Sequence, residues 1–136
     1  MDLEILKIAS NTENNKIIKN FTHSSKNKNP ICVDEMQINL IVKNNKLIEF
    51  GYQCKSCIFC QASVSLLSRK VIQFPIEKIS KLLLNIELLF EENFEQSKKN
   101  NTNEFNEFKK IINSKNISRK ECLLLPFKTL SKALKL

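Results

Sequence analysis

Three cysteines within seven residues form the densest group of reactive side chains in the chain. Cys54, Cys57 and Cys60 lie in the segment QCKSCIFCQASVS, where a run of small residues follows them. Cysteine thiolates are good ligands for zinc and for the iron of iron–sulfur clusters. Either all three bind one metal, or one is a ligand and its two neighbours only pack.

The spacing Cys-x-x-Cys-x-x-Cys resembles the start of the cysteine run that binds the clusters of ferredoxins. That run continues to a fourth cysteine followed by proline. Here QASVSLLS follows Cys60 with neither residue, in a pattern typical of an amphipathic helix. The ferredoxin interpretation is therefore disfavoured, and an electron-transfer iron–sulfur protein is kept as an alternative of another class.

Length and composition predict a single globular domain over residues 1–136. The chain has 42% hydrophobic and 26% charged residues, as soluble folded proteins do. Its net charge of +8 comes from 22 basic residues, of which 20 are lysine and two are arginine. Because the lysines are scattered and no nucleic-acid-binding motif accompanies them, we expect no nucleic-acid partner.

Five cysteines without an export signal favour reduced thiols over a disulfide framework. The N-terminal sequence MDLEILKIAS is acidic at Asp2 and Glu4 and lacks the long apolar core of a secretory signal. No stretch reaches the roughly 18 consecutive apolar residues that a membrane helix needs. We expect a cytoplasmic protein without membrane association, whose cysteines serve metal or sulfur chemistry.

A β-hairpin is the clearest structural element in the sequence. MQINLIVKNNKLIEFGYQC alternates apolar and polar residues on both sides of Asn44-Asn45, and Asn tolerates the left-handed angles of a tight turn. The alternation places Tyr52 and Cys54 on the core-facing side. Residues 10–30 show no sustained period and are predicted to form a loop, in which the single histidine, His23, is solvated.

Helical periodicity dominates the remaining chain. A short helix is predicted near residues 3–9, and a second begins at Ser56 as its N-cap, with Cys57 at the first helical position and Cys60 on the buried stripe. Pro75 opens a third helix, a shorter one spans residues 105–112, and the last starts close to Cys122 because Pro126 is tolerated in a first turn. This order predicts an α+β domain with a small antiparallel sheet packed against several helices.

Three motifs in order resemble the NifU/IscU/SufU family of iron–sulfur cluster assembly scaffolds. They are NPICVDE at 29–35, SCIFCQASVSLL at 56–67 and SRKECLLLPFKTLSKAL at 118–134. In that family a Cys-Gly-Asp precedes a hairpin, a second Cys stands five residues before the Ala of an Ala-Ser-x-Ser helix, and a third Cys opens the last helix. The resemblance implies a SufE/NifU-like fold with Cys32, Asp34, Cys57 and Cys122 as the ligand set.

The chain also departs from the family pattern. Val33 replaces the Gly between the first Cys and the Asp, and Cys54 and Ser56 stand where Gly is usual. Glu121 replaces a His or Lys, and its simplest role is a capping box with Ser118. The 65-residue gap from Cys57 to Cys122 resembles the SufU branch, and the Leu-Pro-Pro-Val-Lys chaperone motif of IscU is missing.

Two of the three clustered cysteines match no ligand position of the family. Cys54 and Cys60 both fall on core-facing positions, so we predict that they pack and that Cys57 is the ligand among the three clustered cysteines. A role of Cys54 and Cys60 as ligands or in a sulfur relay is the alternative. Asp34 would add an oxygen ligand that can be exchanged when the site releases its metal or cluster.

The resemblance implies a scaffold and not an enzyme. Such a protein accepts sulfur from a cysteine desulfurase, builds a [2Fe-2S] or related cluster on the four residues, and passes it to apo iron–sulfur proteins. One alternative is a zinc-bound sulfurtransferase of the SufU kind, in which Cys32 or Cys122 accepts the sulfur. Three thiolates and one carboxylate suit Zn²⁺ in a tetrahedral site as well as they suit iron.

Overall fold

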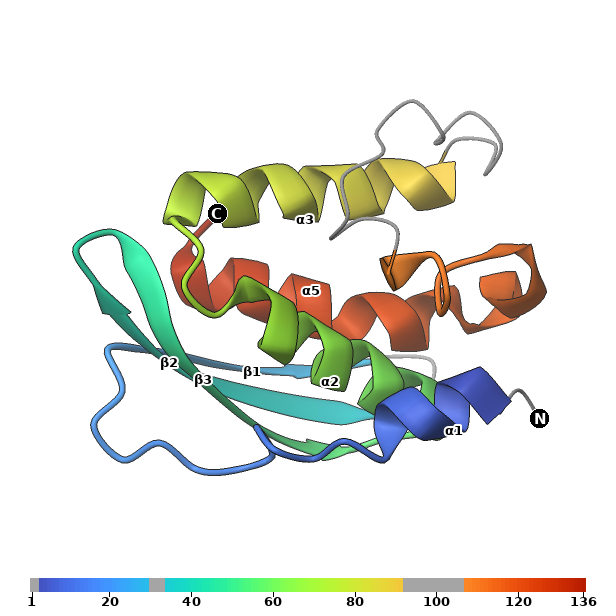
Figure 1. Ribbon diagram of the computed structural model, residues 1–136, viewed down its shortest axis with the longest axis horizontal. Helices are drawn as coiled ribbons and strands as arrows, with labels where there is room; N and C mark the ends of the chain where they lie inside the picture. The colour runs from blue at the N-terminus through green and yellow to red at the C-terminus, as the bar shows by residue number, and fades with distance from the viewer. Residues whose placement is uncertain (1–2, 30–33, 92–106) are drawn as a thin grey trace.

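A computed structural model describes residues 3–29, 34–91 and 107–136, in which helices cover one face of a three-stranded sheet (Figure 1). The elements are α1 (Leu3–Ala9), β1 (His23–Lys28), β2 (Glu35–Lys43), β3 (Lys46–Lys55), α2 (Ile58–Val71), α3 (Ile76–Glu91), the 3-10 helix η2 (Ser114–Arg119) and α5 (Lys120–Leu134). Helices α2 and α5 lie against the sheet, and α3 lies beyond them. The predicted α+β class is confirmed.

Strands β2 and β3 form the hairpin that the sequence predicts. They are antiparallel, with Met36 opposite Cys54 and Leu40 opposite Phe50. The turn residues Asn44 and Asn45 have φ angles of 52° and 62°, which Asn adopts more readily than other residues with a side chain. Because the strands are antiparallel, the outer ends of the hairpin, Glu35 and Lys55, are paired at one edge of the sheet.

The predicted loop over residues 10–30 is wrong at His23–Lys28, which forms β1 and pairs antiparallel with β2. The sequence HSSKNK carries no apolar alternation, because this strand is held by backbone pairing and by polar contacts with α5. Ser25 Oγ donates to the Thr129 carbonyl at 2.6 Å, and Lys132 Nζ donates to the Lys26 carbonyl at 3.0 Å. His23 is therefore half-buried on a strand and not solvated in a loop.

The segment between α1 and β1 packs against β3. The Tyr52 N–H donates to the Asn14 carbonyl at 3.0 Å, and Ile18 is buried next to Gly51. A Cβ at Gly51 would lie 2.7 Å from the Lys16 carbonyl oxygen and 2.9 Å from Ile18 Cγ1. Glycine is thus required here so that the segment can approach the strand closely.

Helices α2 and α5 are joined in the core by a buried hydrogen bond. Ser63 Oγ donates to the Leu123 carbonyl at 2.6 Å, directly beside Cys122. Helix α5 begins at Lys120, slightly earlier than the sequence indicated, so Pro126 lies inside the helix and not in its first turn. Proline has no N–H to donate to the carbonyl of Cys122, four residues earlier.

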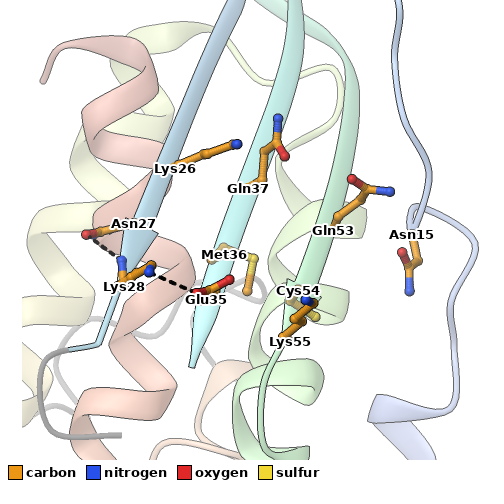
Figure 2. A pocket seen from close by; sticks show the side chains of 10 residues that line it. All are labelled: Asn15, Lys26, Asn27, Lys28, Glu35, Met36, Gln37, Gln53, Cys54 and Lys55. Carbon is orange, nitrogen blue, oxygen red and sulfur yellow. Dashed lines mark hydrogen bonds and ion pairs between the residues drawn. The ribbon is translucent and has the colours of Figure 1, made fainter. Parts of the chain in front are cut away.

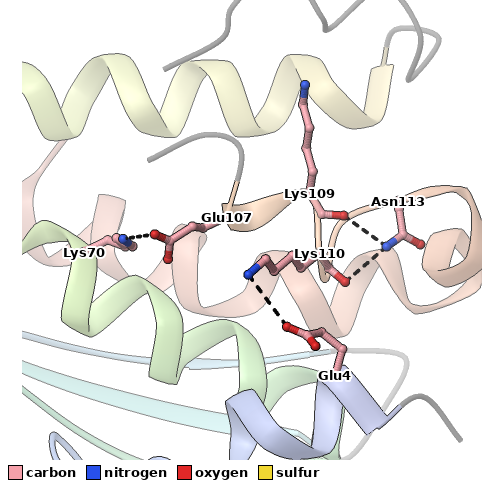
Figure 3. Close-up of polar contacts among 6 residues, drawn as sticks. All are labelled: Glu4, Lys70, Glu107, Lys109, Lys110 and Asn113. Atoms are coloured by element: carbon pink, nitrogen blue, oxygen red, sulfur yellow. Dashed lines mark hydrogen bonds and ion pairs between the residues drawn. The ribbon is translucent and has the colours of Figure 1, made fainter. Parts of the chain in front are cut away.

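Residues 107–113 are held against α1 and α2 by polar contacts (Figure 3). Lys70 of α2 pairs with Glu107, and Lys110 pairs with Glu4 of α1 at 3.8 Å. Most apolar side chains that helical spacing predicts for the last three segments are buried in the core: Ile79, Leu82, Leu83, Ile86, Phe108, Ile111, Ile112, Phe127 and Leu130. Ile76 and Leu134 are only partly buried. Phe105 lies outside the described residues. Among the described helices, none combines the length and apolar character needed to cross a membrane.

Gly51→Ala should destabilise the fold by about 1–3 kcal/mol, because the new methyl group overlaps a backbone oxygen that cannot move freely. Urea unfolding followed by circular dichroism measures this loss. The matched control is Gln53→Ala, an exposed position on the same strand, which should change stability by no more than about 0.5 kcal/mol. Equal stability of the two variants would show that the segment does not pack on Gly51.

Candidate metal centre

Asp34, Cys57 and Cys122 come together at one end of the sheet. A carboxylate oxygen and two sulfur atoms, one from each residue, all lie within 4.8 Å of one another. Asp34 is 6% exposed and Cys122 is 2% exposed, whereas Cys57 is half-buried. Two thiols and a carboxylate supply three of the four ligands of a tetrahedral zinc site, and the same thiols can bind iron.

The hairpin and the two long helices position these three residues. Asp34 directly precedes β2 and Cys57 follows β3 by two residues, so the pairing of Glu35 with Lys55 brings them to the same edge. Cys122 lies in the first turn of α5, whose N-terminal end reaches that edge. Cys57 and Cys122 therefore both lie at the N-terminal ends of helices that meet at this edge of the sheet.

The Asp34 carboxylate also caps helix α2. The Cys57 N–H donates to Asp34 Oδ1 at 3.1 Å, and Cys57 Sγ lies 3.7 Å from Asp34 Oδ2. Helix α2 begins at Ile58 with Cys57 as its N-cap, so the predicted cap at Ser56 is displaced by one residue. The Cys57 side chain forms no capping hydrogen bond. The Asp34 carboxylate instead accepts a hydrogen bond from the backbone N–H of this N-cap residue.

Two other predictions near the site have different outcomes. Cys32, the remaining predicted ligand, lies outside the described residues together with Val33. Glu121 does not form the predicted capping box with Ser118, because the N-cap of α5 is Arg119 and it makes no side-chain capping bond. Glu121 instead pairs with Lys128 at 3.3 Å, on the exposed side of α5.

Cys54 and Cys60 stand apart from this group of ligand atoms. Cys60 is fully buried in the core together with Val64 and Leu67, as predicted. Cys54 lies on the helix-facing side of β3 but is only half-buried, which is less than predicted. Burial is the main cause that raises the pKa of both thiols, so both remain protonated at neutral pH and are weak competitors for a metal. Tyr52 packs in the sheet, as predicted, with its ring edge-on to Phe50.

A contact between Phe59 and Arg119 adds a connection that the sequence did not indicate. The Arg119 guanidinium lies 5.4 Å from the centre of the Phe59 ring, a distance at which a cation is attracted to the ring face. The contact joins the starts of α2 and α5 beside Cys57 and Cys122. No local pattern reveals it, because the two residues meet only when the helices pack.

A groove of about 400 Å³ opens at the same end of the sheet (Figure 2). The charged residues that line it are Lys26, Lys28, Lys55 and Glu35, so the lining is mainly basic. A hydrogen bond from Lys28 and the positive charge of that residue lower the pKa of Glu35. Among the described cysteines, Cys54 is the one that lines this groove. The Cys54 side chain nevertheless lies on the helix-facing side of β3, opposite to the exposed side chains of Gln53 and Lys55.

A comparison with family models matches residues 2–102 to the NifU-like N-terminal domain. Among curated proteins, the chain is similar to the iron–sulfur cluster assembly scaffold protein IscU of Thermotoga maritima. The two are 30% identical over 109 residues, which cover 79% of this chain and 73% of that protein.

Solved structures show the same fold. The putative iron–sulfur cluster assembly scaffold protein for the SUF system from Fervidobacterium islandicum superposes with a TM-score of 0.86 at 21% identity, covering 98% of this chain and 96% of that one. The N-terminal part of a nitrogen-fixing NifU-like protein from Brucella abortus gives a TM-score of 0.82 at 18% identity, covering 98% and 91%.

Cys57→Ser and Cys122→Ser should each lower zinc affinity by at least about 100-fold, because a hydroxyl replaces a soft thiolate ligand. Competition with a chromophoric chelator measures the affinity. Cys54→Ala and Cys60→Ala are the matched controls and should bind zinc as the wild type does, with about 1 kcal/mol less stability for Cys60→Ala. Loss of zinc binding in either control would instead support a site built from Cys54, Cys57 and Cys60.

Proposed function

Because the chain belongs to the NifU-like N-terminal domain family of iron–sulfur cluster assembly scaffolds, we propose that it builds a cluster on Cys32, Asp34, Cys57 and Cys122 and passes it to apo-proteins. The observation that carries the proposal is the convergence of Asp34, Cys57 and Cys122, with their ligand atoms within 4.8 Å. Three segments distant in the sequence supply these residues.

The cluster is the cargo of such a protein, and each residue has a distinct role toward it. The three cysteine thiolates bind the iron, and Cys32 is the further thiolate because it precedes Asp34 by only two residues in the sequence. Cys57 is half-buried, so a partner can reach the cluster from this side. Asp34 contributes an oxygen that a recipient thiol displaces easily, since iron in such clusters prefers sulfur ligands.

The proposal includes the partners that the reaction requires. A cysteine desulfurase supplies the sulfur, iron enters at the thiolates, and an apo iron–sulfur protein receives a [2Fe-2S] or related cluster. A cytoplasmic location belongs to the same proposal, because free thiols of this kind persist in a reducing compartment.

A zinc-bound sulfurtransferase is the second candidate. The observation that favours it is the donor set itself, since two thiols and a carboxylate within 4.8 Å suit tetrahedral zinc without any iron. In that case the metal orients a thiolate that accepts sulfur, and no cluster is assembled.

Reconstitution under anaerobic conditions with ferrous iron and sulfide distinguishes these functions. A labile cluster with visible absorption that moves to an apo-ferredoxin supports the scaffold. Tight zinc that iron does not displace, together with stimulation of a desulfurase, supports the transferase. A stable cluster with a reversible redox couple and no transfer would identify an electron carrier and overturn the proposal.

Asp34→Ala should lengthen the lifetime of the reconstituted cluster, because it removes the ligand that water or a partner thiol displaces. The decay of visible absorption in the presence of a chelator measures the lifetime. The variant also loses the cap of α2 and should be less stable by about 1 kcal/mol. Asp34→Asn is the control, since its amide oxygen can still accept the Cys57 N–H without a negative charge. Faster decay in a folded Asp34→Ala protein would disprove the role of the carboxylate in release.

A further inference from the structure

We propose that the basic groove on the outer face of the sheet binds an extended acidic segment of the apo-protein that receives the cluster. The outer face is the side of the sheet that faces away from α2 and α5 (Figure 1). This inference rests on the proposed function, because it names the surface that holds the recipient. It also gives a role to lysines that are scattered in the sequence and come together only in the folded sheet.

Two rows of side chains form the floor of the groove, and strand register fixes both rows. Across β1, β2 and β3, one row is Lys28, Glu35 and Lys55, and the next is Lys26, Gln37 and Gln53. Residues directly opposite one another in antiparallel strands point to the same face of the sheet. The alternate row faces the helices, since its central residue Met36 is 1% exposed. The two rows therefore face outward, as their place in the groove of Figure 2 also indicates.

The segment before β1 closes one side of the groove. The third outward-facing row contains Asn39 opposite Gly51, and the backbone at Lys16 and the side chain of Ile18 lie directly over Gly51. Asn39 is consequently only 3% exposed. Asn15, from the same segment, borders the groove beside β3 in Figure 2. The two open rows thus form a depression of about 400 Å³ and not a flat surface.

The charge of the groove favours an anionic partner. Its three lysines and one glutamate leave a net charge of +2. Glu35 is paired with Lys28 at 3.0 Å, whereas neither Lys26 nor Lys55 forms an ion pair with a described residue. The last two side chains are also exposed. Two ammonium groups on either side of a neutralised pair are therefore available to carboxylates of a partner.

The dimensions and the neutral lining residues favour an extended peptide over a small anion. Lys28 and Lys55 lie on the two outer strands, so their backbones are about 10 Å apart, a length that about three extended residues span. One small ion cannot contact lysines on both sides. Gln37 and Gln53 lie between them, and each amide offers a donor and an acceptor for the peptide groups of a bound segment.

The groove lies beside the site that the cluster would leave. Glu35 directly follows Asp34, and Lys55 precedes Cys57 by two residues. The hydrogen bond of 3.1 Å from the Cys57 N–H to Asp34 joins the two chain segments just beyond the groove. A segment held in the groove therefore places the rest of the recipient next to the half-buried Cys57. Docking there raises the local concentration of recipient thiols at the proposed site of transfer.

Crosslinking of the full chain tests where an acidic segment binds. The probe is an acetylated peptide of alternating glutamate and glycine, and a carbodiimide joins its carboxylates to lysine amines within contact distance. Protease digestion and mass spectrometry should place the crosslinks mainly on Lys26 and Lys55. Salt at about 0.5 M should remove them, because it screens interactions between exposed charges. An even distribution of crosslinks over the exposed lysines would contradict the proposal.

Transfer kinetics test whether the groove serves the recipient. The variant Lys26→Glu/Lys55→Glu should transfer a reconstituted cluster to an acidic apo-ferredoxin about tenfold more slowly at subsaturating recipient and low salt. The matched control is Lys43→Glu/Lys46→Glu, at the hairpin turn, where both lysines are exposed. It has the same net charge as the first variant and should slow transfer by less than about twofold. Cluster assembly from iron and sulfide requires no partner and should be equal in both variants.

The failure of the docking role differs from the failure of the proposed function. If both double variants transfer the cluster at the same rate, the groove does not hold the recipient, although the scaffold function stands. If the wild type assembles a cluster but transfers none to the apo-ferredoxin, the proposed function and the recipient as occupant of the groove are both wrong. Specific crosslinking of the peptide in that case would identify the groove as a site for another acidic protein.

Discussion

The hydrogen bond from the Cys57 N–H to the Asp34 carboxylate connects the parts of the molecule on which the site depends. Asp34 precedes one strand of the hairpin and Cys57 follows the other, so the bond closes the open end of the hairpin and begins α2. A negative charge at a helix N-terminus is stabilising. The same carboxylate therefore contributes to the fold and, in the proposed function, serves as a ligand.

Helix α5 completes the site through contacts that are unrelated to metal chemistry. Ser63 Oγ donates a hydrogen bond to the Leu123 carbonyl, and the Arg119 guanidinium lies over the Phe59 ring. These two contacts join α5 to α2 on both sides of Cys122. Pro126 interrupts the helical hydrogen bonding just beyond this turn. The position of the buried Cys122 thiol is therefore set by packing, which the proposed release of a cluster requires.

Burial separates the described cysteines into two chemical classes. Cys57 and Cys122 lie at helix N-termini beside a carboxylate, where thiolates can bind a metal. Cys54 and Cys60 lie in less polar surroundings that raise the pKa of both thiols and keep them protonated. Four similar side chains can therefore have different functions within one small region, and the difference comes from their surroundings and not from their spacing.

Local sequence patterns predict most of the helices and strands, and the sequence fixes the order of the cysteine motifs. The alternation around Asn44-Asn45 predicted the hairpin, helical periodicity predicted α2, α3 and α5, and the three cysteine motifs indicated the family. It did not reveal β1, because HSSKNK has no apolar period and becomes a strand only by pairing with β2 and contacting α5. Nor did it show that Asp34 caps α2 or that Arg119 lies over the Phe59 ring. These features depend on residues far apart in the chain that meet only after the sheet and helices have packed, and local patterns contain no information about such contacts.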